Sequence, residues 1–137
     1  MKWNVRAADE FGIRSIDVHM LAELSQYDQP GESLAQSLID LFLPSAPELF
    51  ITIRRAHDRN DIHRAAHALK SSSAQLGAKQ LADLCQKLED QTGPDDEAGP
   101  FIEPTILEIE LHLKRAMRDL RIIQNLIRED QATKAAS

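Results

Sequence analysis

The chain has 137 residues, the usual size of one domain, and 42% of them are hydrophobic while only 4% are aromatic. A core so poor in aromatic side chains has to be built from Leu, Ile and Ala, which favours packed helices over a β-sandwich. The formal net charge of −6 argues against a nucleic-acid partner, because binding phosphates needs clustered cations. The single cysteine, Cys85, excludes an internal disulfide and predicts a reducing compartment, which indicates the cytoplasm.

The N-terminal part of the chain predicts a lead-in followed by one short helix. Residues 1–14 have mixed polarity and lack the apolar centre of a secretory signal, so they are expected to be a loose lead-in. The short amphipathic helix begins near residue 15 and ends at the turn signal of residues 28–31. No uninterrupted run of about 18 apolar residues occurs, so no membrane span is expected.

Two further segments have the apolar spacing of helices. Between residues 33 and 57 apolar residues recur every three or four positions, but Pro44 and Pro47 interrupt them. This segment is therefore either one kinked helix or two helices in sequence, and the spacing does not decide between them. Residues 61–90 then predict two helices separated by a tight turn at Gly77.

The C-terminal part consists of a polar linker at residues 91–100 and one long helix from about residue 104 to 130. The apolar spacings of this helix alternate between three and four, as in helices packed at shallow angles. The predicted fold is therefore all-α, an antiparallel four-helix bundle over residues 15–131 with a short accessory N-terminal helix and a polar tail at 132–137. A monomer is expected, although four outward apolar residues leave room for self-association: Leu107, Leu111, Ile122 and Leu126.

His67 is predicted to point away from the bundle core. On a helical wheel with about 100° per residue, the apolar positions of its helix gather on one face around Ile62. His67 lies about 140° from that direction and Lys70 about 80° from it, on the same flank. Ser71 and Ala74, both small, surround the imidazole. An exposed histidine with small neighbours is open to a bulky protein partner.

This arrangement suits phosphoryl transfer. An imidazole nitrogen is a competent nucleophile near neutral pH, because its unperturbed pKa is about 6.5. The reaction depends mainly on in-line approach and on charge stabilisation. His67 is therefore the candidate phosphoryl acceptor and donor, and Lys70 is the candidate cation beside the phosphoryl oxygens. A partner is expected to bring the acidic, metal-bearing site, and no cofactor bound by this chain is expected.

Glu89 is predicted to orient the imidazole. A hairpin that turns at Gly77 brings His67, ten residues earlier, and Glu89, twelve residues later, to a similar height. A carboxylate that accepts a hydrogen bond from one ring nitrogen fixes the tautomer and leaves the other nitrogen free to attack. His63 and His67 have a spacing that can hold a metal, but no Glu-x-x-His or His-Glu-x-x-His motif accompanies them, so no metal site is expected.

The string AHALKSSSAQLGA at residues 66–78, followed by LADLCQKLE at 81–89, resembles the signature of histidine-containing phosphotransfer (Hpt) domains of multistep two-component relays. The preceding LIDLFLPSAPELF is similar to the corresponding helix of that family. The resemblance covers residues 15–90, and its motif has Lys at +3, Gly at +10 and an acidic or amide residue at +22 from the histidine. Ser71 is a departure, because many members carry Gly at +4.

The resemblance implies an all-helical phosphorelay intermediate. It implies that His67 is phosphorylated on Nε2, that Lys70 is its charge partner and that Glu89 binds the other ring nitrogen. The implied partners are response-regulator receiver domains and a hybrid sensor histidine kinase, with Mg²⁺ on the receiver domain. The chain would take the phosphoryl group from one receiver aspartate and pass it to another receiver domain. No nucleotide-binding loop or kinase signature is present, so no kinase activity of its own is expected.

Three questions stay open at this point. Ile16, Val18 and Leu21 are either core residues or part of a receiver-docking patch, because the family's receivers dock around the first helix. A helical adaptor that binds a receiver domain or kinase without carrying phosphate is the alternative function, and a metal-binding four-helix protein is a second one. Met1 and the polar tail favour a free-standing protein over a piece of a hybrid kinase.

Overall fold

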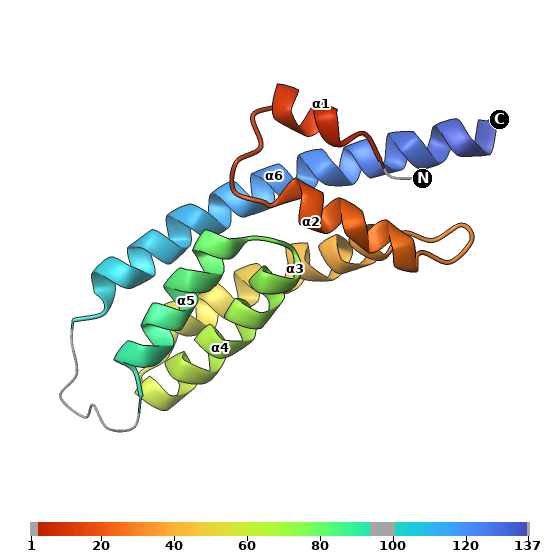
Figure 1. The fold of residues 1–137 in the computed structure, drawn as a ribbon. Helices are drawn as coiled ribbons and strands as arrows, with labels where there is room; N and C mark the ends of the chain where they lie inside the picture. The colour runs from red at the N-terminus through yellow and green to blue at the C-terminus, as the bar shows by residue number, and fades with distance from the viewer. Residues whose placement is uncertain (1–2, 94–100, 137) are drawn as a thin grey trace.

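A computed structural model describes residues 3–93 and 101–136, and the described part contains helices and no strand. Four of the helices form the bundle: α3 (Leu34–Arg55), α4 (Arg59–Gln75), α5 (Lys79–Gln91) and α6 (Glu103–Ala136). Helix α3 packs against α4 and α6, and α5 packs against the same two helices, so the four close into a ring (Figure 1). The predicted all-α bundle is confirmed.

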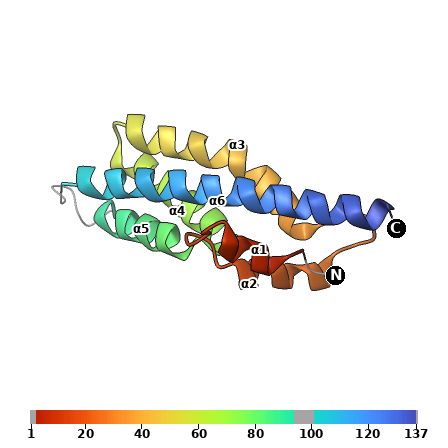
Figure 2. The ribbon, with the colours of Figure 1, turned by 90° about the horizontal axis from the view of Figure 1, so that it is seen from above.

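Helix α6 is longer than the bundle and carries the N-terminal segment on its second half (Figure 2). That segment consists of α1 (Val5–Glu10), α2 (Val18–Glu23) and the 3-10 helix η1 (Leu24–Tyr27). Helix α6 extends to Ala136 and so includes most of the polar tail predicted at residues 132–137. Helix α5 ends at Gln91, the first residue of the linker predicted at 91–100, and residues 94–100 of that linker lie outside the described part.

Residues 3–14 do not form a loose lead-in, so that expectation is wrong for this described part of the segment. Asn4 caps α1 by accepting a hydrogen bond from the backbone N–H of Ala7 at 3.3 Å. Trp3, Ala8 and Ile13 are buried in the same core as the bundle. These few apolar residues do not recur at the spacing of an amphipathic helix, so the sequence did not indicate one. They are buried because α1 packs against α6.

Asp119 of α6 holds the connection between α1 and α2 in place. Its side chain is only 4% exposed. Its Oδ2 atom accepts hydrogen bonds from the Ser15 hydroxyl at 2.7 Å and from the backbone N–H groups of Ser15 and Arg14 at 3.1 and 3.3 Å. Because a buried carboxylate is costly unless its oxygens are paired, this contact fixes where the N-terminal segment lies on α6.

Helix α3 is one continuous helix that contains both Pro44 and Pro47, which answers the question left open by the sequence. Each proline lacks the N–H that an interior residue donates, a loss that costs about 3 kcal/mol or more in an isolated helix. The core face of α3 offsets this cost, since six of its side chains are buried: Ala35, Ile39, Phe42, Ala46, Phe50 and Ile53.

Among the helices of the described part, α3 alone is long and apolar enough to span a membrane, by length and composition only. The expectation that no segment spans a membrane therefore stays a prediction. The apolar content of α3 serves the bundle core on one face and leaves Leu41 and Ile51 exposed on another. Asp40, Glu48 and Arg55 share that outer surface.

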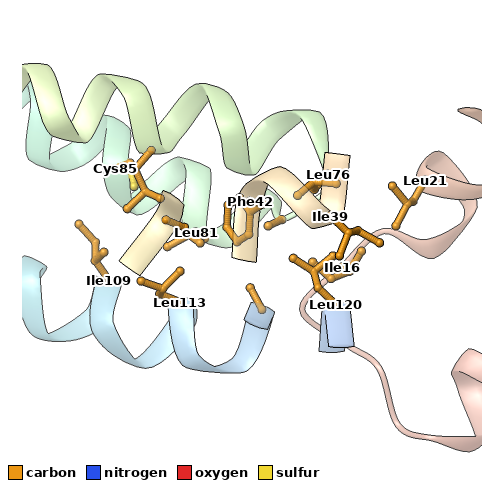
Figure 3. Packing of buried hydrophobic residues seen from close by; sticks show 14 of the residues in the cluster. Ile16, Leu21, Ile39, Phe42, Leu76, Leu81, Cys85, Ile109, Leu113 and Leu120 are labelled. Carbon is orange, nitrogen blue, oxygen red and sulfur yellow. The ribbon is translucent and has the colours of Figure 1, made fainter. Parts of the chain in front are cut away.

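The core extends from the bundle to the N-terminal segment, where Ile16 and Leu21 belong to the same cluster (Figure 3). Within the bundle, Leu81 and Cys85 lie near Ile109 and Leu113 of α6. Towards the N-terminal segment, a second group of buried side chains continues the same cluster: Ile16, Leu21, Ile39, Leu76 and Leu120. Of the residues singled out for self-association, Leu107 and Leu111 are exposed, whereas Ile122 and Leu126 are partly buried against the core.

The turn between α4 and α5 depends on Gly77. Its φ of +76° lies in the left-handed region that residues with a Cβ rarely adopt. Its carbonyl oxygen accepts the backbone N–H of Asp17 at 2.9 Å, and Asp17 also caps α2 through Met20 and pairs with Lys79. A Cβ at position 77 would lie 3.1 Å from the Cβ and the carbonyl oxygen of Asp17. The turn thus joins the hairpin to the start of α2.

Replacing Gly77 by Ala is expected to destabilise the protein more than replacing Gly31 by Ala. Both glycines have positive φ, so each substitution costs about 1–2 kcal/mol in backbone strain. Only Gly77 has a close neighbour, because nothing lies within 4 Å of a Cβ built at Gly31. Urea denaturation of the two variants measures the difference, and equal losses of unfolding free energy would contradict the close packing at Asp17.

Candidate functional site

His67 stands on the outer surface of α4, as the helical wheel predicted. Its side chain is 62% exposed. Helix α4 begins at Arg59, where the Asp58 side chain accepts the backbone N–H of Asn60 at 2.8 Å. The next positions on the same surface, Ser71 and Ala74, are exposed and small. A protein partner can therefore approach the ring without meeting a long side chain from these two positions.

Glu89 of α5 lies beside the imidazole, and the hairpin at Gly77 brings the two residues together. The Nδ1 atom of His67 is 3.2 Å from Oε1 of Glu89. A carboxylate can only accept hydrogen bonds, so in the neutral ring this contact requires the proton on Nδ1. The lone pair of Nε2 is then free. The imidazole is thus held in the tautomer that can attack an electrophile from Nε2.

Lys70 lies on the same flank, but its ammonium group is engaged rather than free. Its Nζ atom is 2.7 Å from Oε1 of Glu89 and 2.8 Å from Oε1 of Gln86. The side chain is one quarter exposed. One carboxylate oxygen therefore binds both the ring and the ammonium group. The sequence predicted that Lys70 would stand near His67, and it missed the contacts with Glu89 and Gln86.

The ionisation of Glu89 reflects this double contact. The side chain of Glu89 is only 10% exposed, and its burial acts to raise the pKa of the carboxyl group. Hydrogen bonds from Lys70 and His67, together with their charges, outweigh burial, so the pKa of Glu89 lies below its ordinary value of 4.5. Glu89 is therefore a carboxylate at neutral pH and is available as a hydrogen-bond acceptor.

His63, for which no metal site was expected, links α4 to the end of α5. Its Nδ1 atom is 2.9 Å from the carbonyl oxygen of Glu89 and 3.4 Å from the Thr92 hydroxyl. This contact holds the backbone of Glu89 in place, so His63 helps to position the Glu89 side chain beside His67. In the described part of the chain, no group of three or more His, Cys, Asp or Glu side chains is arranged to hold a metal.

Cys85 lies in the core, one turn before Glu89 on α5. Burial is the main cause that raises the pKa of its thiol, to about 12, and the nearby Glu89 carboxylate adds to the effect. A thiol with such a pKa stays protonated at neutral pH and is a poor nucleophile. The chemistry of this surface therefore rests on the imidazole.

The docking assignment of Ile16, Val18 and Leu21 is corrected by the structure. Their side chains are 5%, 7% and 0% exposed, so they are core residues and offer no surface to a partner. The sequence contained more apolar residues in this segment than one bundle face requires. The extra ones pack against α1 and join the same buried cluster as Ile39 and Leu120.

Replacing Glu89 by Gln is expected to lower the free energy of unfolding by about 1–3 kcal/mol at neutral pH, because two charged hydrogen bonds are weakened. A carboxyl group whose pKa is lower in the folded protein stabilises it above its unfolded pKa, and loses that effect as the pH falls. The gap between the parent and the variant should therefore shrink as the pH falls below about 4.5. Urea denaturation across pH 3–7 checks this, with the exposed Asp83→Asn as control. A gap that widens towards low pH would contradict the ion pair.

The chain is similar to known phosphotransfer proteins in sequence and in fold. The family model of the Hpt domain matches residues 37–123, which is more than half of the chain. Among solved structures, the chain is similar to histidine-containing phosphotransfer protein B (HptB) from Pseudomonas aeruginosa PAO1, with 20% sequence identity and a TM-score of 0.54. The match covers 87% of this chain and 96% of that one, and at this identity it shows a shared fold. A comparison with curated protein sequences gave no match.

The matched family has a defined role. Its members are phosphocarriers rather than kinases, they are typically soluble, and they interact with response-regulator receiver domains and kinases in phosphorelays. Residues 37–123 include α4 and α5, which carry the imidazole, the ammonium group and the carboxylate described above. The chain belongs to the Hpt domain family of histidine phosphotransfer proteins.

Proposed function

We propose that His67 accepts a phosphoryl group on Nε2 from the aspartyl phosphate of one receiver domain and passes it to the receiver domain of another response regulator. One observation carries this proposal: the ring is 62% exposed while its Nδ1 atom faces the Glu89 carboxylate. The nitrogen that has to attack is therefore the one that is free. The family match supports the same chemistry at the level of the family.

The transfer step is an in-line exchange at phosphorus. The bond between phosphorus and the aspartyl oxygen breaks and leaves a carboxylate on the receiver, while a bond forms between phosphorus and Nε2. The Nδ1 proton stays on the ring, which becomes a cation. Glu89 stabilises that positive charge, since its carboxylate already contacts Nδ1 at 3.2 Å. Passing the phosphoryl group on reverses these changes.

Lys70 is the charge partner in this proposal. Its ammonium group and the imidazole contact the same oxygen of Glu89, so the cation lies next to the ring that receives the phosphoryl group. The receiver domain supplies Mg²⁺ from its own acidic site, and this chain holds no cofactor. A hybrid sensor histidine kinase is the source of the phosphoryl group, and the exchange takes place in the cytoplasm.

The parent protein is expected to acquire an acid-labile, base-stable label when it is incubated with a phosphorylated receiver domain and Mg²⁺. His67→Gln should abolish the label, because no imidazole remains to form the phosphorus–nitrogen bond. The exposed His57→Gln is the matched control and should be labelled like the parent. A parent protein that binds the receiver but never acquires label would favour the adaptor function instead.

Lys70→Ala is expected to slow phosphoryl acceptance or to shorten the lifetime of the phosphohistidine, by about tenfold or more. The reason is the loss of a positive charge beside the phosphoryl oxygens, with little loss of core volume. Single-turnover transfer from a phosphorylated receiver measures both quantities, and Lys87→Ala, an exposed lysine of α5, is the control. Transfer rates equal to those of the parent would remove Lys70 from the site.

A further inference from the structure

Gln86 makes a specific pair of contacts that neither the motif nor the proposed transfer step uses. It lies on α5, three residues before Glu89. Its Oε1 atom accepts a hydrogen bond from Nζ of Lys70 at 2.8 Å, and its Nε2 atom donates one to Oδ1 of Asp90 at 2.8 Å. The side-chain amide thus bridges a cation on α4 and an anion on α5.

The polarity of these contacts fixes which way the amide faces. A carboxylate accepts hydrogen bonds and an ammonium group donates them, so the amide nitrogen has to face Asp90 and the amide oxygen has to face Lys70. The opposite orientation would set two acceptors together on one side and two donors on the other. Asp90 therefore orients Gln86, and Gln86 offers the ammonium group one defined acceptor.

From this arrangement we infer that Gln86 is a positioning residue for phosphotransfer, acting through Lys70; the inference rests on the proposed function of His67. A lysine side chain has about 2 kcal/mol of rotamer entropy and no preferred direction of its own. Two acceptors on α5, one from Gln86 and one from Glu89, hold Nζ on the flank of the imidazole. The ammonium group is thereby placed before the phosphoryl group arrives.

The neutral amide also suits the charge balance of the site. Lys70 and His67 both contact Oε1 of Glu89, at 2.7 and 3.2 Å. Gln86 gives Lys70 a second partner without adding a negative charge close to the incoming phosphoryl oxygens, which a carboxylate would repel. Because the amide is uncharged, the hydrogen bond that Lys70 donates to Gln86 is weaker than the one that it donates to Glu89, so a phosphoryl oxygen can replace Gln86 as the acceptor.

A double-mutant cycle tests this inference. Gln86→Met keeps the length of the side chain and removes both hydrogen bonds, so single-turnover acceptance from a phosphorylated receiver should slow by about threefold to tenfold. In the Lys70→Ala background the same change should have no further effect, because the group that Gln86 positions is gone. Gln80→Met, an exposed glutamine of the same helix, is the matched control and should transfer at the parent rate.

The outcomes separate the inference from the function on which it rests. Slowing in the parent background alone, with an unchanged denaturation midpoint, supports the role of Gln86. Equal slowing in both backgrounds, or no slowing in either, overturns it even though the parent is labelled on His67. A parent protein that takes up no label overturns the proposed function, and the positioning role fails with it.

Discussion

The alignment of α4 with α5 is the constraint on which the site depends, and it is set at one turn. Gly77 adopts a left-handed conformation there, and its carbonyl oxygen binds the backbone of Asp17. A different turn would shift the register of the two helices and carry Glu89 away from His67. The contact between His67 on α4 and Glu89 on α5 therefore depends on the backbone conformation of Gly77, which is ten to twelve residues away from both.

The Glu89 carboxylate connects this alignment to the chemistry. It is almost fully buried, and burial of a charge is unfavourable unless the charge is well paired. Here Lys70 and His67 supply the pairing, while the backbone of Glu89 is held by His63. These contacts offset the cost of burying the Glu89 carboxylate between the helices. The contact with His67 also keeps the imidazole in one tautomer and leaves its Nε2 atom exposed.

Much of this could be predicted from the sequence, because it depends on local periodicity. The exposure of His67, the flank position of Lys70 and the turn at Gly77 all follow from helical spacing within residues 61–90. The contacts of Gln86 could not be predicted, since they depend on the rotation of α5 about its axis relative to α4. One signal was present: Gln86 stands three residues before Glu89 and so shares a flank with it.

The N-terminal segment shows the limit of such reasoning. Its burial depends on α6, which is more than a hundred residues away in the chain, and on the contacts that Asp119 makes with Ser15. The apolar spacing of residues 1–27 alone does not predict those contacts. For the same reason the sequence left Ile16 and Leu21 open between core and surface, and only their place in the common buried cluster decides the question.

The environment of Cys85 has a practical consequence. It is the single thiol of the chain, it is fully buried in the bundle, and burial raises its pKa to about 12. A thiol-specific alkylating reagent can reach the sulfur atom only after the helices separate. The rate at which Cys85 is alkylated therefore reports how often the bundle opens, and no label has to be added to the protein.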